Sequence, residues 1–183
     1  LLSDNIKFHS YTLSFKNKSK NITSVLLEKT EYIENYYLGS KKNWATNAGT
    51  YRKILQKNIY EGIDLKIYSM DGLLKYDLHL FKGSNFREIK IKYHGHDKIE
   101  LKKGNLLIST SVNNITEFKP FSYQIIDGNK IEIECNFILK KNTVSFNFPN
   151  GFNHEYSLVI DPTLVFSTYS GSISDNFGYT ATY

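Results

Sequence analysis

The stretch that decides the fold runs from residue 63 to residue 80 and reads IDLKIYSMDGLLKYDLHL. Apolar side chains occupy every second position on both sides of a central Met70-Asp71-Gly72, as Ile63, Leu65 and Ile67 before it and Leu74, Tyr76, Leu78 and Leu80 after it. Alternation with period two is typical of a strand with one buried face, and a glycine-containing turn between two such runs is typical of a hairpin. Residues 63–80 therefore predict two antiparallel strands.

The rest of the chain repeats this pattern in short segments that end in Gly, Asn, Asp or Lys. We predict hairpins that pair 99–101 with 106–109 and 130–139 with 143–148, and strands near 6–15, 51–57, 87–93, 121–126 and 155–160. Residues 20–38 fit neither helical nor strand spacing, so we expect an irregular segment with a strand at each end. One helical turn is expected at 40–44, with Trp44 folded back onto the sheet. The predicted fold class is all-β: an antiparallel β-sandwich-like domain, followed by the first strand of a truncated repeat region.

A domain boundary is predicted at Asp161-Pro162. Proline cannot donate a ladder hydrogen bond, so Pro162 marks the exit from the apolar run 158–160. One further strand and a Gly/Ser-rich stretch follow, and these cannot bury a face of their own. We therefore expect a domain at 1–161 and the incomplete start of a repeat at 162–183.

Composition narrows the classes of function. The 183 residues carry a net charge of +5 and include a single cysteine, Cys135, which excludes an internal disulfide. The lysine pairs at 41–42, 102–103 and 140–141 lie beside turn residues and not along one face, so no nucleic-acid partner is predicted. No apolar run reaches the roughly 18 residues that span a bilayer, so the chain is not expected to be transmembrane.

Motifs for nucleotide, phosphate, zinc-protease and serine-hydrolase chemistry are lacking in the sequence. Asp64 and Asp77 are candidate acid/base carboxylates, but both alternate with apolar residues and lie near Lys66 and Lys75, which favours surface ion pairs. His94-Gly95-His96 places two imidazoles at alternate positions, but no further ligand stands at a fixed spacing. We predict no enzyme activity, no metal site and no cofactor.

Aromatic residues are concentrated between residues 36 and 76. Tyrosine and tryptophan present a flat apolar face and a polar edge, on which sugar rings stack. The same residues also suit strands that complete a core. A carbohydrate-binding surface is thus an alternative interpretation, and its candidate residues are Trp44, Tyr51, Tyr60, Tyr68 and Tyr76.

Several motifs together resemble one family. They are NYYLG at 35–39, Trp44, Tyr51, NIYEGIDL at 58–65, LKYD at 74–77, LVIDP at 158–162, and FSTY at 166–169 followed by Gly171 and Asp175. In this order they resemble an uncharacterised β-rich domain near the start of SBBP-repeat (β-propeller-type repeat) surface proteins of bacteria, especially Bacteroidota. The resemblance covers roughly residues 30–183. It departs at Lys82-Gly83-Ser84-Asn85, where relatives carry Pro-Gly-Ala-Asp, and at Ser170-Gly171, where they carry two glycines.

The resemblance implies a setting but no catalytic residues. It implies export, often by type IX secretion, a place on the outer cell surface or outside the cell, and association with adhesion or gliding motility. Our leading hypothesis is a non-enzymatic structural and interaction module that braces a propeller-like repeat array. Its partners would be the repeat region of the same polypeptide, and surface glycans or other cell-surface and secretion proteins.

Overall fold

The hairpin at 63–80 forms as predicted and lies at the centre of the largest sheet. The computed structural model describes residues 7–70 and 73–166. Strand β4 (Ile63–Met70) pairs with β5 (Leu73–Leu80) in unbroken register, from Ile63 opposite Leu80 to Met70 opposite Leu73. Apolar residues on alternate positions therefore share one face, which is buried except near the turn, where Leu74 is exposed. The intervening polar residues share the other face.

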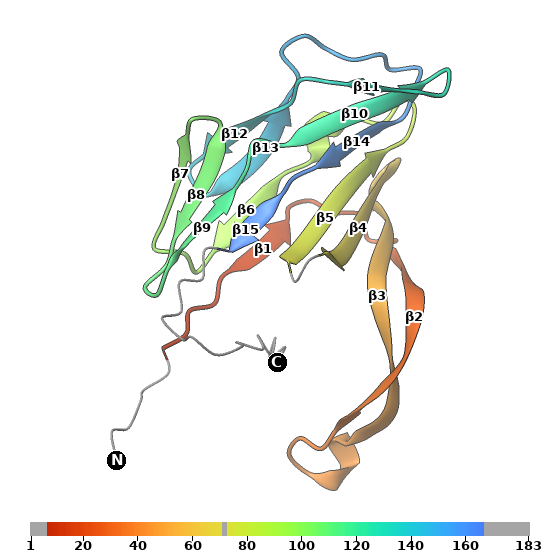
Figure 1. The fold of residues 1–183 in the computed structure, drawn as a ribbon, viewed down its shortest axis with the longest axis vertical. Helices are drawn as coiled ribbons and strands as arrows, with labels where there is room; N and C mark the ends of the chain where they lie inside the picture. Colours follow the sequence, from red (N-terminus) through yellow and green to blue (C-terminus); the bar gives the residue numbers. More distant parts are fainter. Residues whose placement is uncertain (1–6, 71–72, 167–183) are drawn as a thin grey trace.

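Three antiparallel sheets make up the described part of the chain (Figure 1). The largest has seven strands in the order β11 (Asn129–Glu132), β10 (Phe121–Ile126), β14 (Leu158–Asp161), β5, β4, β3 (Ala45–Tyr60) and β2 (Thr23–Tyr36). A second contains β1 (Thr12–Phe15), β6 (Ile91–His94), β13 (Thr143–Asn147) and β12 (Asn136–Lys140). A third contains β15 (Leu164–Phe166), β9 (Asn114–Glu117), β8 (Asn105–Ser109) and β7 (Lys98–Lys102). Two short 3₁₀ turns lie at Lys41–Asn43 and Phe86–Glu88.

One hydrophobic core joins the three sheets. The seven-stranded sheet contributes Ile63, Leu65, Leu78, Leu80, Leu158 and Ile160, and the smaller sheets contribute Ile91, Tyr93, Leu106, Ile108 and Val144, each at most 2% exposed. The two smaller sheets thus cover one face of the large one. This arrangement confirms the predicted all-β, antiparallel, sandwich-like fold class.

A buried carboxyl group lies where the three sheets meet. Glu117 on β9 is fully buried and accepts hydrogen bonds from the hydroxyl of Tyr76 on β5, at 2.7 Å, and of Tyr93 on β6, at 2.5 Å. Tyr11 stacks on Tyr93 with ring centroids 6.4 Å apart. Burial raises the pKa of Glu117, while the two tyrosine hydroxyls act to lower it. Burial, with Glu117 nearby, also raises the pKa of Tyr11 to about 12, so its hydroxyl stays neutral.

Two predicted segments were wrong. Residues 20–38 are mostly one long strand, β2, because Glu28 adopts a left-handed backbone (φ 57°) and the register shifts beyond Lys29, which breaks the alternation in the sequence. The predicted strand 130–139 is two strands in different sheets: β11 pairs with β10 and β12 pairs with β13. The missed signal is Asp127-Gly128, whose positive φ angles of 51° and 80° make the β10–β11 turn.

Other local predictions hold in part. The turn expected at 40–44 is a 3₁₀ turn, in which the Ser40 side chain makes no capping bond. Trp44 does not fold back onto the sheet, since it lies at the end of the β2–β3 hairpin and is 44% exposed. Strand β14 ends at Asp161, and β15 follows and pairs with β9. The domain boundary at Asp161-Pro162 stays a prediction. The rest of the predicted repeat, 167–183, lies outside the described residues.

The core assignment predicts a contrast between two leucines that face each other across β7 and β8. Leu106 is fully buried and its partner Leu101 is 40% exposed. We expect Leu106→Ala to lower the free energy of unfolding by about 2–5 kcal/mol, because it leaves a cavity. Leu101→Ala should cost less than about 1 kcal/mol. Urea unfolding measures both, and equal losses would contradict the assignment.

Burial of Glu117 predicts how stability depends on pH. A carboxyl whose pKa is raised in the fold binds its proton more tightly there than in the unfolded chain. It therefore stabilises the fold at low pH, and this contribution is lost as the pH rises from the ordinary pKa through the raised one. Glu117→Gln, which cannot ionise, should gain stability relative to the wild type over that window, by at most about 1.4 kcal/mol per pH unit.

Urea unfolding between pH 4 and pH 8 measures this difference. Glu100→Gln is the matched control, because Lys98 lowers the pKa of the partly exposed Glu100 and the sign of the pH dependence reverses. Its effect should be small, since exposed pairs are screened by water. A Glu117→Gln difference that stays constant with pH would contradict the prediction.

Candidate functional site

The distal half of the β2–β3 hairpin extends beyond the rest of the sheet (Figure 1). Strand β3 pairs with β4 from Lys53, opposite Tyr68, to Tyr60, whereas β2 and β3 continue to pair as far as Tyr36 and Ala45. Residues 29–52, called the arm below, are therefore a two-stranded ribbon over most of their length. Such ribbons are marginally stable in water without further packing.

Side-chain hydrogen bonds hold the arm together where its ladder is irregular. The hydroxyls of Thr30 and Thr50 bond to each other across the ribbon, and the Thr50 hydroxyl also lies 3.0 Å from the Tyr32 carbonyl. Nearer the tip, the Asn47 amide donates to the side chain of Asn35 at 2.9 Å. These bonds replace backbone bonds lost at the register shifts, so the arm keeps its shape without a core of its own.

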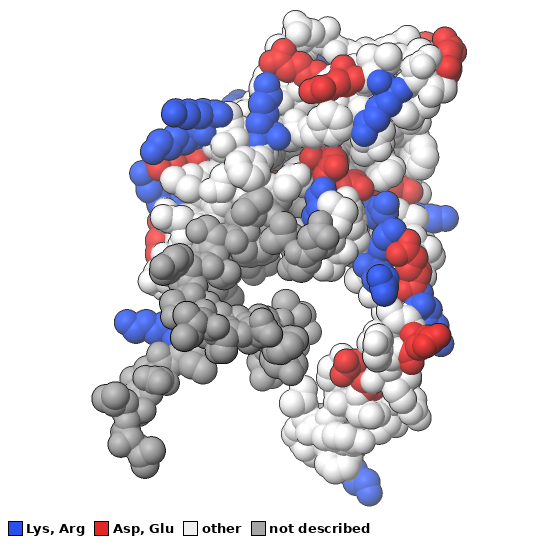
Figure 2. Space-filling view, viewed as in Figure 1, with Lys and Arg blue, Asp and Glu red and all other residues white. Residues whose placement is uncertain are grey.

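The tip of the arm exposes apolar side chains. Tyr37 and Trp44 pack edge to face with centroids 5.0 Å apart, and they are 58% and 44% exposed. Leu38 beside them is 55% exposed. Lys41 and Lys42 are the basic residues of the connecting turn, and Figure 2 shows the end of the arm as mostly uncharged surface with a basic extremity. Exposed aromatic clusters of this kind are typical of contact surfaces.

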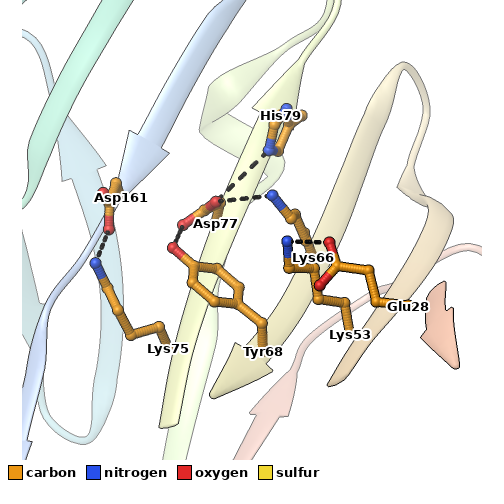
Figure 3. Close-up of polar contacts among 8 residues, drawn as sticks. All are labelled: Glu28, Lys53, Lys66, Tyr68, Lys75, Asp77, His79 and Asp161. Atoms are coloured by element: carbon orange, nitrogen blue, oxygen red, sulfur yellow. Dashed lines mark hydrogen bonds and ion pairs between the residues drawn. The ribbon is translucent and has the colours of Figure 1, made fainter. Parts of the chain in front are cut away.

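A second polar group lies on the outer face of the seven-stranded sheet, the face that the smaller sheets leave uncovered (Figure 3). Asp77 on β5 is its centre and is only 7% exposed. Its carboxylate accepts a hydrogen bond from the Tyr68 hydroxyl at 3.0 Å, and it lies 3.9 Å from Lys66 Nζ and 3.8 Å from His79 Nε2. The carboxylate therefore has partners on both sides along β4 and β5.

A parallel ion pair joins β5 to β14 on the same face. Lys75 Nζ lies 3.1 Å from Asp161 Oδ1, and Lys75 is 6% exposed. The ring of Tyr68 lies between the two pairs, with Lys66 Nζ 5.1 Å and Lys75 Nζ 5.9 Å from its centroid. Burial and the nearby Asp77 carboxylate raise the pKa of Tyr68, so its hydroxyl remains a donor. The outer face therefore presents charges that are already neutralised by one another.

Aromatic side chains extend this face onto β10. Lys130 Nζ lies 3.9 Å from the ring centroid of Tyr123 and 4.8 Å from that of Phe121. Burial, followed by the nearby Asp77 and Asp161, raises the pKa of Tyr123. Cation–aromatic pairs and ion pairs together cover the middle of the sheet.

The structure does not bring the five candidate sugar-binding residues together. Trp44 lies at the arm tip and Tyr51 within the arm, and both are exposed. Tyr68 belongs to the outer-face network. Tyr60 is buried with its hydroxyl donating to a backbone carbonyl at 2.9 Å, and Tyr76 is buried against the core carboxyl.

The candidate carboxylates Asp64 and Asp77 share the outer face but have separate partners. Asp64 Oδ1 accepts a hydrogen bond from a backbone amide, that of Asn58, at 2.8 Å. Lys66 lies near Asp77 as the sequence predicted, but Lys75 pairs with Asp161, which the sequence analysis singled out only as a domain boundary and as part of a family motif.

The two candidate metal-binding histidines lie at a bend. Strand β6 ends at His94, and Gly95 adopts φ 82° with a Cβ position only 3.0 Å from the Ser10 carbonyl oxygen, so a larger residue would clash there. Nδ1 of His96 is buried with no hydrogen-bond partner. Across residues 7–70 and 73–166, no group of three metal-ligating side chains is assembled.

The single thiol is inert. Cys135 is 1% exposed and lines a recess of about 640 Å³ together with Lys119, Glu134 and Asn150. Burial raises its pKa to about 12, so it stays protonated at neutral pH.

Sequence reasoning missed Glu117 and the partners Tyr93 and Asp161. A signal existed for Glu117, because it follows Ile115 at alternate spacing and so shares its buried face. Of the exposed pair at the arm tip, the sequence analysis had named Trp44 as a candidate sugar-binding residue but not Tyr37.

No helical segment in the described part of the chain is long and apolar enough to cross a bilayer.

Comparison with known proteins gives one match. The family model of a domain of unknown function, DUF7948, matches residues 2–163. No curated protein and no solved structure matches the chain. The matched range begins before β1 and ends just after β14, so it takes in the large sheet and its arm. The chain therefore belongs to the DUF7948 family of domains of unknown function.

Proposed function

We propose that this domain is a non-enzymatic structural and interaction module of a large secreted or cell-surface bacterial protein. In this proposal the arm contacts the repeat region of the same polypeptide and braces it, in a protein of adhesion or gliding motility. The observation that carries the proposal is the arm itself, a ribbon that leaves the body and exposes apolar side chains along its length.

The free energy needed to order the exposed arm supports a role in contact with a partner. Tyr32 is 75% exposed and Ile33 is 57% exposed, so neither gains much from burial within this domain. Ordering a ribbon costs backbone entropy that exposed side chains do not offset. A partner surface that covers these side chains would supply the missing burial.

The outer-face network supports a contact role as well. Asp77 and Lys75 each have partners on a neighbouring strand, which hold both side chains in place on the sheet. Paired charges on a rigid sheet define the orientation of a macromolecular contact at little desolvation cost.

Shortening the arm tests the proposal. Replacing residues 31–49 with Asn-Gly keeps Thr30 opposite Thr50, in register with Lys29 opposite Tyr51. This change should alter the free energy of unfolding of this domain by less than about 1 kcal/mol, because the removed segment lies outside the core. In the full-length polypeptide, the same change should speed limited proteolysis of the region that follows residue 166. Mass spectrometry of the fragments locates the cuts.

The control for arm shortening is the double variant Lys140→Ala/Lys141→Ala, which alters an exposed turn on the opposite sheet. It should leave the proteolysis pattern unchanged. Identical cleavage rates in the wild-type and arm-shortened polypeptides would contradict a bracing role for the arm.

Carbohydrate binding is the second candidate function, and the exposed aromatic pair at the arm tip favours it. Tyr37 and Trp44 are each about half exposed, so part of each ring is available for a sugar to stack on. The bracing proposal predicts that the wild-type chain gives no signal above background on a glycan array. A signal lost in Trp44→Ala but kept in Phe118→Ala, which removes an exposed ring outside the arm, would establish the second candidate instead.

A further inference from the structure

A row of side chains leads from the core to the base of the arm on the inner face of the large sheet, the face that the smaller sheets cover. Tyr76, Ile67, Ile54 and Leu26 stand directly opposite one another on β5, β4, β3 and β2. Opposed residues in antiparallel strands share a face, so all four point to the inner side. Tyr76 is 8% exposed, Ile54 37% and Leu26 51%. The smaller sheets therefore cover the start of the row and leave its end uncovered.

Leu74 widens this uncovered surface. It precedes Tyr76 by two positions on β5, so it lies on the same face, and it is 54% exposed. Leu26, Ile54 and Leu74, called the inner patch below, are large apolar side chains on the same face as Ile67, which is partly buried against the core. The patch continues the hydrophobic core past the limit of the second layer.

The chain leaves the described structure next to the inner patch. Strand β14 runs antiparallel to β5, from Leu158 opposite Leu80 to Ile160 opposite Leu78, so it advances toward the end of β5 that carries Leu74. Strand β15 follows at once and packs against β5, and its Leu164 stands opposite Glu117, the residue that binds the Tyr76 hydroxyl. The chain after Phe166 thus begins at the covered end of the row.

The remaining segment has the length and pattern to cover the patch. Three strand spacings, about 14 Å, separate the β5 and β2 positions of the row. The 17 residues from 167 to 183 could span more than 50 Å when extended, about 3.3 Å per residue. Their last part, residues 177–183, reads FGYTATY, which places Phe177, Tyr179, Ala181 and Tyr183 on alternate positions. This pattern is typical of a strand with one apolar face.

We propose that residues 167–183 dock across the inner patch and cover Leu26, Ile54 and Leu74 with the apolar side of 177–183. The proposal rests on the proposed function, because it identifies where the polypeptide that follows the domain first contacts it. A tether of this length gives a high effective concentration at the patch, which favours this segment over a second copy of the chain.

Disulfide trapping tests the docking directly. The wild-type chain is a suitable background, because its one thiol, Cys135, is buried and protonated. In the double variant Leu74→Cys/Phe177→Cys, mild oxidation should form an intramolecular disulfide, detected by non-reducing electrophoresis and peptide mass spectrometry. The matched control is Met70→Cys/Phe177→Cys, since Met70 lies at the same end of the β4–β5 hairpin, on the opposite face, and is 48% exposed.

We expect the Leu74 pair to close at least ~10-fold faster than the Met70 pair, because docking raises the local concentration of the two thiols. Equal rates would overturn the proposal. Predominant intermolecular disulfides through Leu74→Cys would overturn it too, by showing that a second copy covers the patch. Leu74 and Met70 are both exposed, and Phe177 lies outside the described residues, so neither double variant removes a side chain of the described core.

Hydrogen exchange supplies an independent measurement. In the chain of 183 residues, amides near Leu26 and Ile54 should exchange at least ~10-fold more slowly than in a chain that ends at Phe166. Unchanged exchange would count against docking. The proteolysis test of the arm distinguishes this proposal from the proposed function. If arm shortening speeds proteolysis but no disulfide forms between residues 74 and 177, the bracing function stands and only docking at the inner patch is wrong.

Discussion

The carboxyl group of Glu117 is the constraint on which the arrangement of the three sheets depends. It is fully buried, so it requires polar partners, and the hydroxyls of Tyr76 and Tyr93 supply them from the other two sheets. An apolar contact would tolerate small displacements between layers, whereas two short hydrogen bonds to one carboxyl do not. The two hydrogen bonds therefore fix the distance and register between β5, β6 and β9. Loss of either tyrosine hydroxyl would leave a buried carboxyl oxygen unsatisfied.

The arm follows from unequal coverage of the large sheet. Tyr76 is held beneath β9 and is buried, whereas Leu26 at the other end of the row is exposed, so the second layer ends between them. Strands β2 and β3 are 14 and 16 residues long, whereas β4 and β5 have 8 each. The β2–β3 hairpin therefore extends beyond β4 and β5 and beyond the two smaller sheets. The exposed apolar residues of the arm are the direct result, and the arm extends away from the rest of the sheet (Figure 1).

Local alternation predicted the strands whose ladders are regular and failed where they are not. The hairpin at 63–80 keeps one register throughout, so each residue's face could be inferred from its position alone. In β2 the left-handed Glu28 moves later residues out of phase, and no period survives in the sequence. Outer-face placement of Asp64 and Asp77 was predictable for the same reason. Their partners were not, because the pairing of Lys75 with Asp161 depends on which strand lies beside β5, a long-range choice that the sequence pattern does not carry.

The irregularities in β2 also determine how the arm can make contact. As the edge strand of a seven-stranded sheet, β2 would offer a row of free backbone donors and acceptors to any added strand. The positive φ of Glu28 turns the backbone out of that row, and the Tyr32 amide is taken by the Thr30 hydroxyl at 3.2 Å. Strand addition along the edge is therefore interrupted at the base of the arm and again midway. Contact through the faces remains, and there the specificity comes from side chains such as Leu26 on the inner face and Trp44 at the tip, not from backbone pairing.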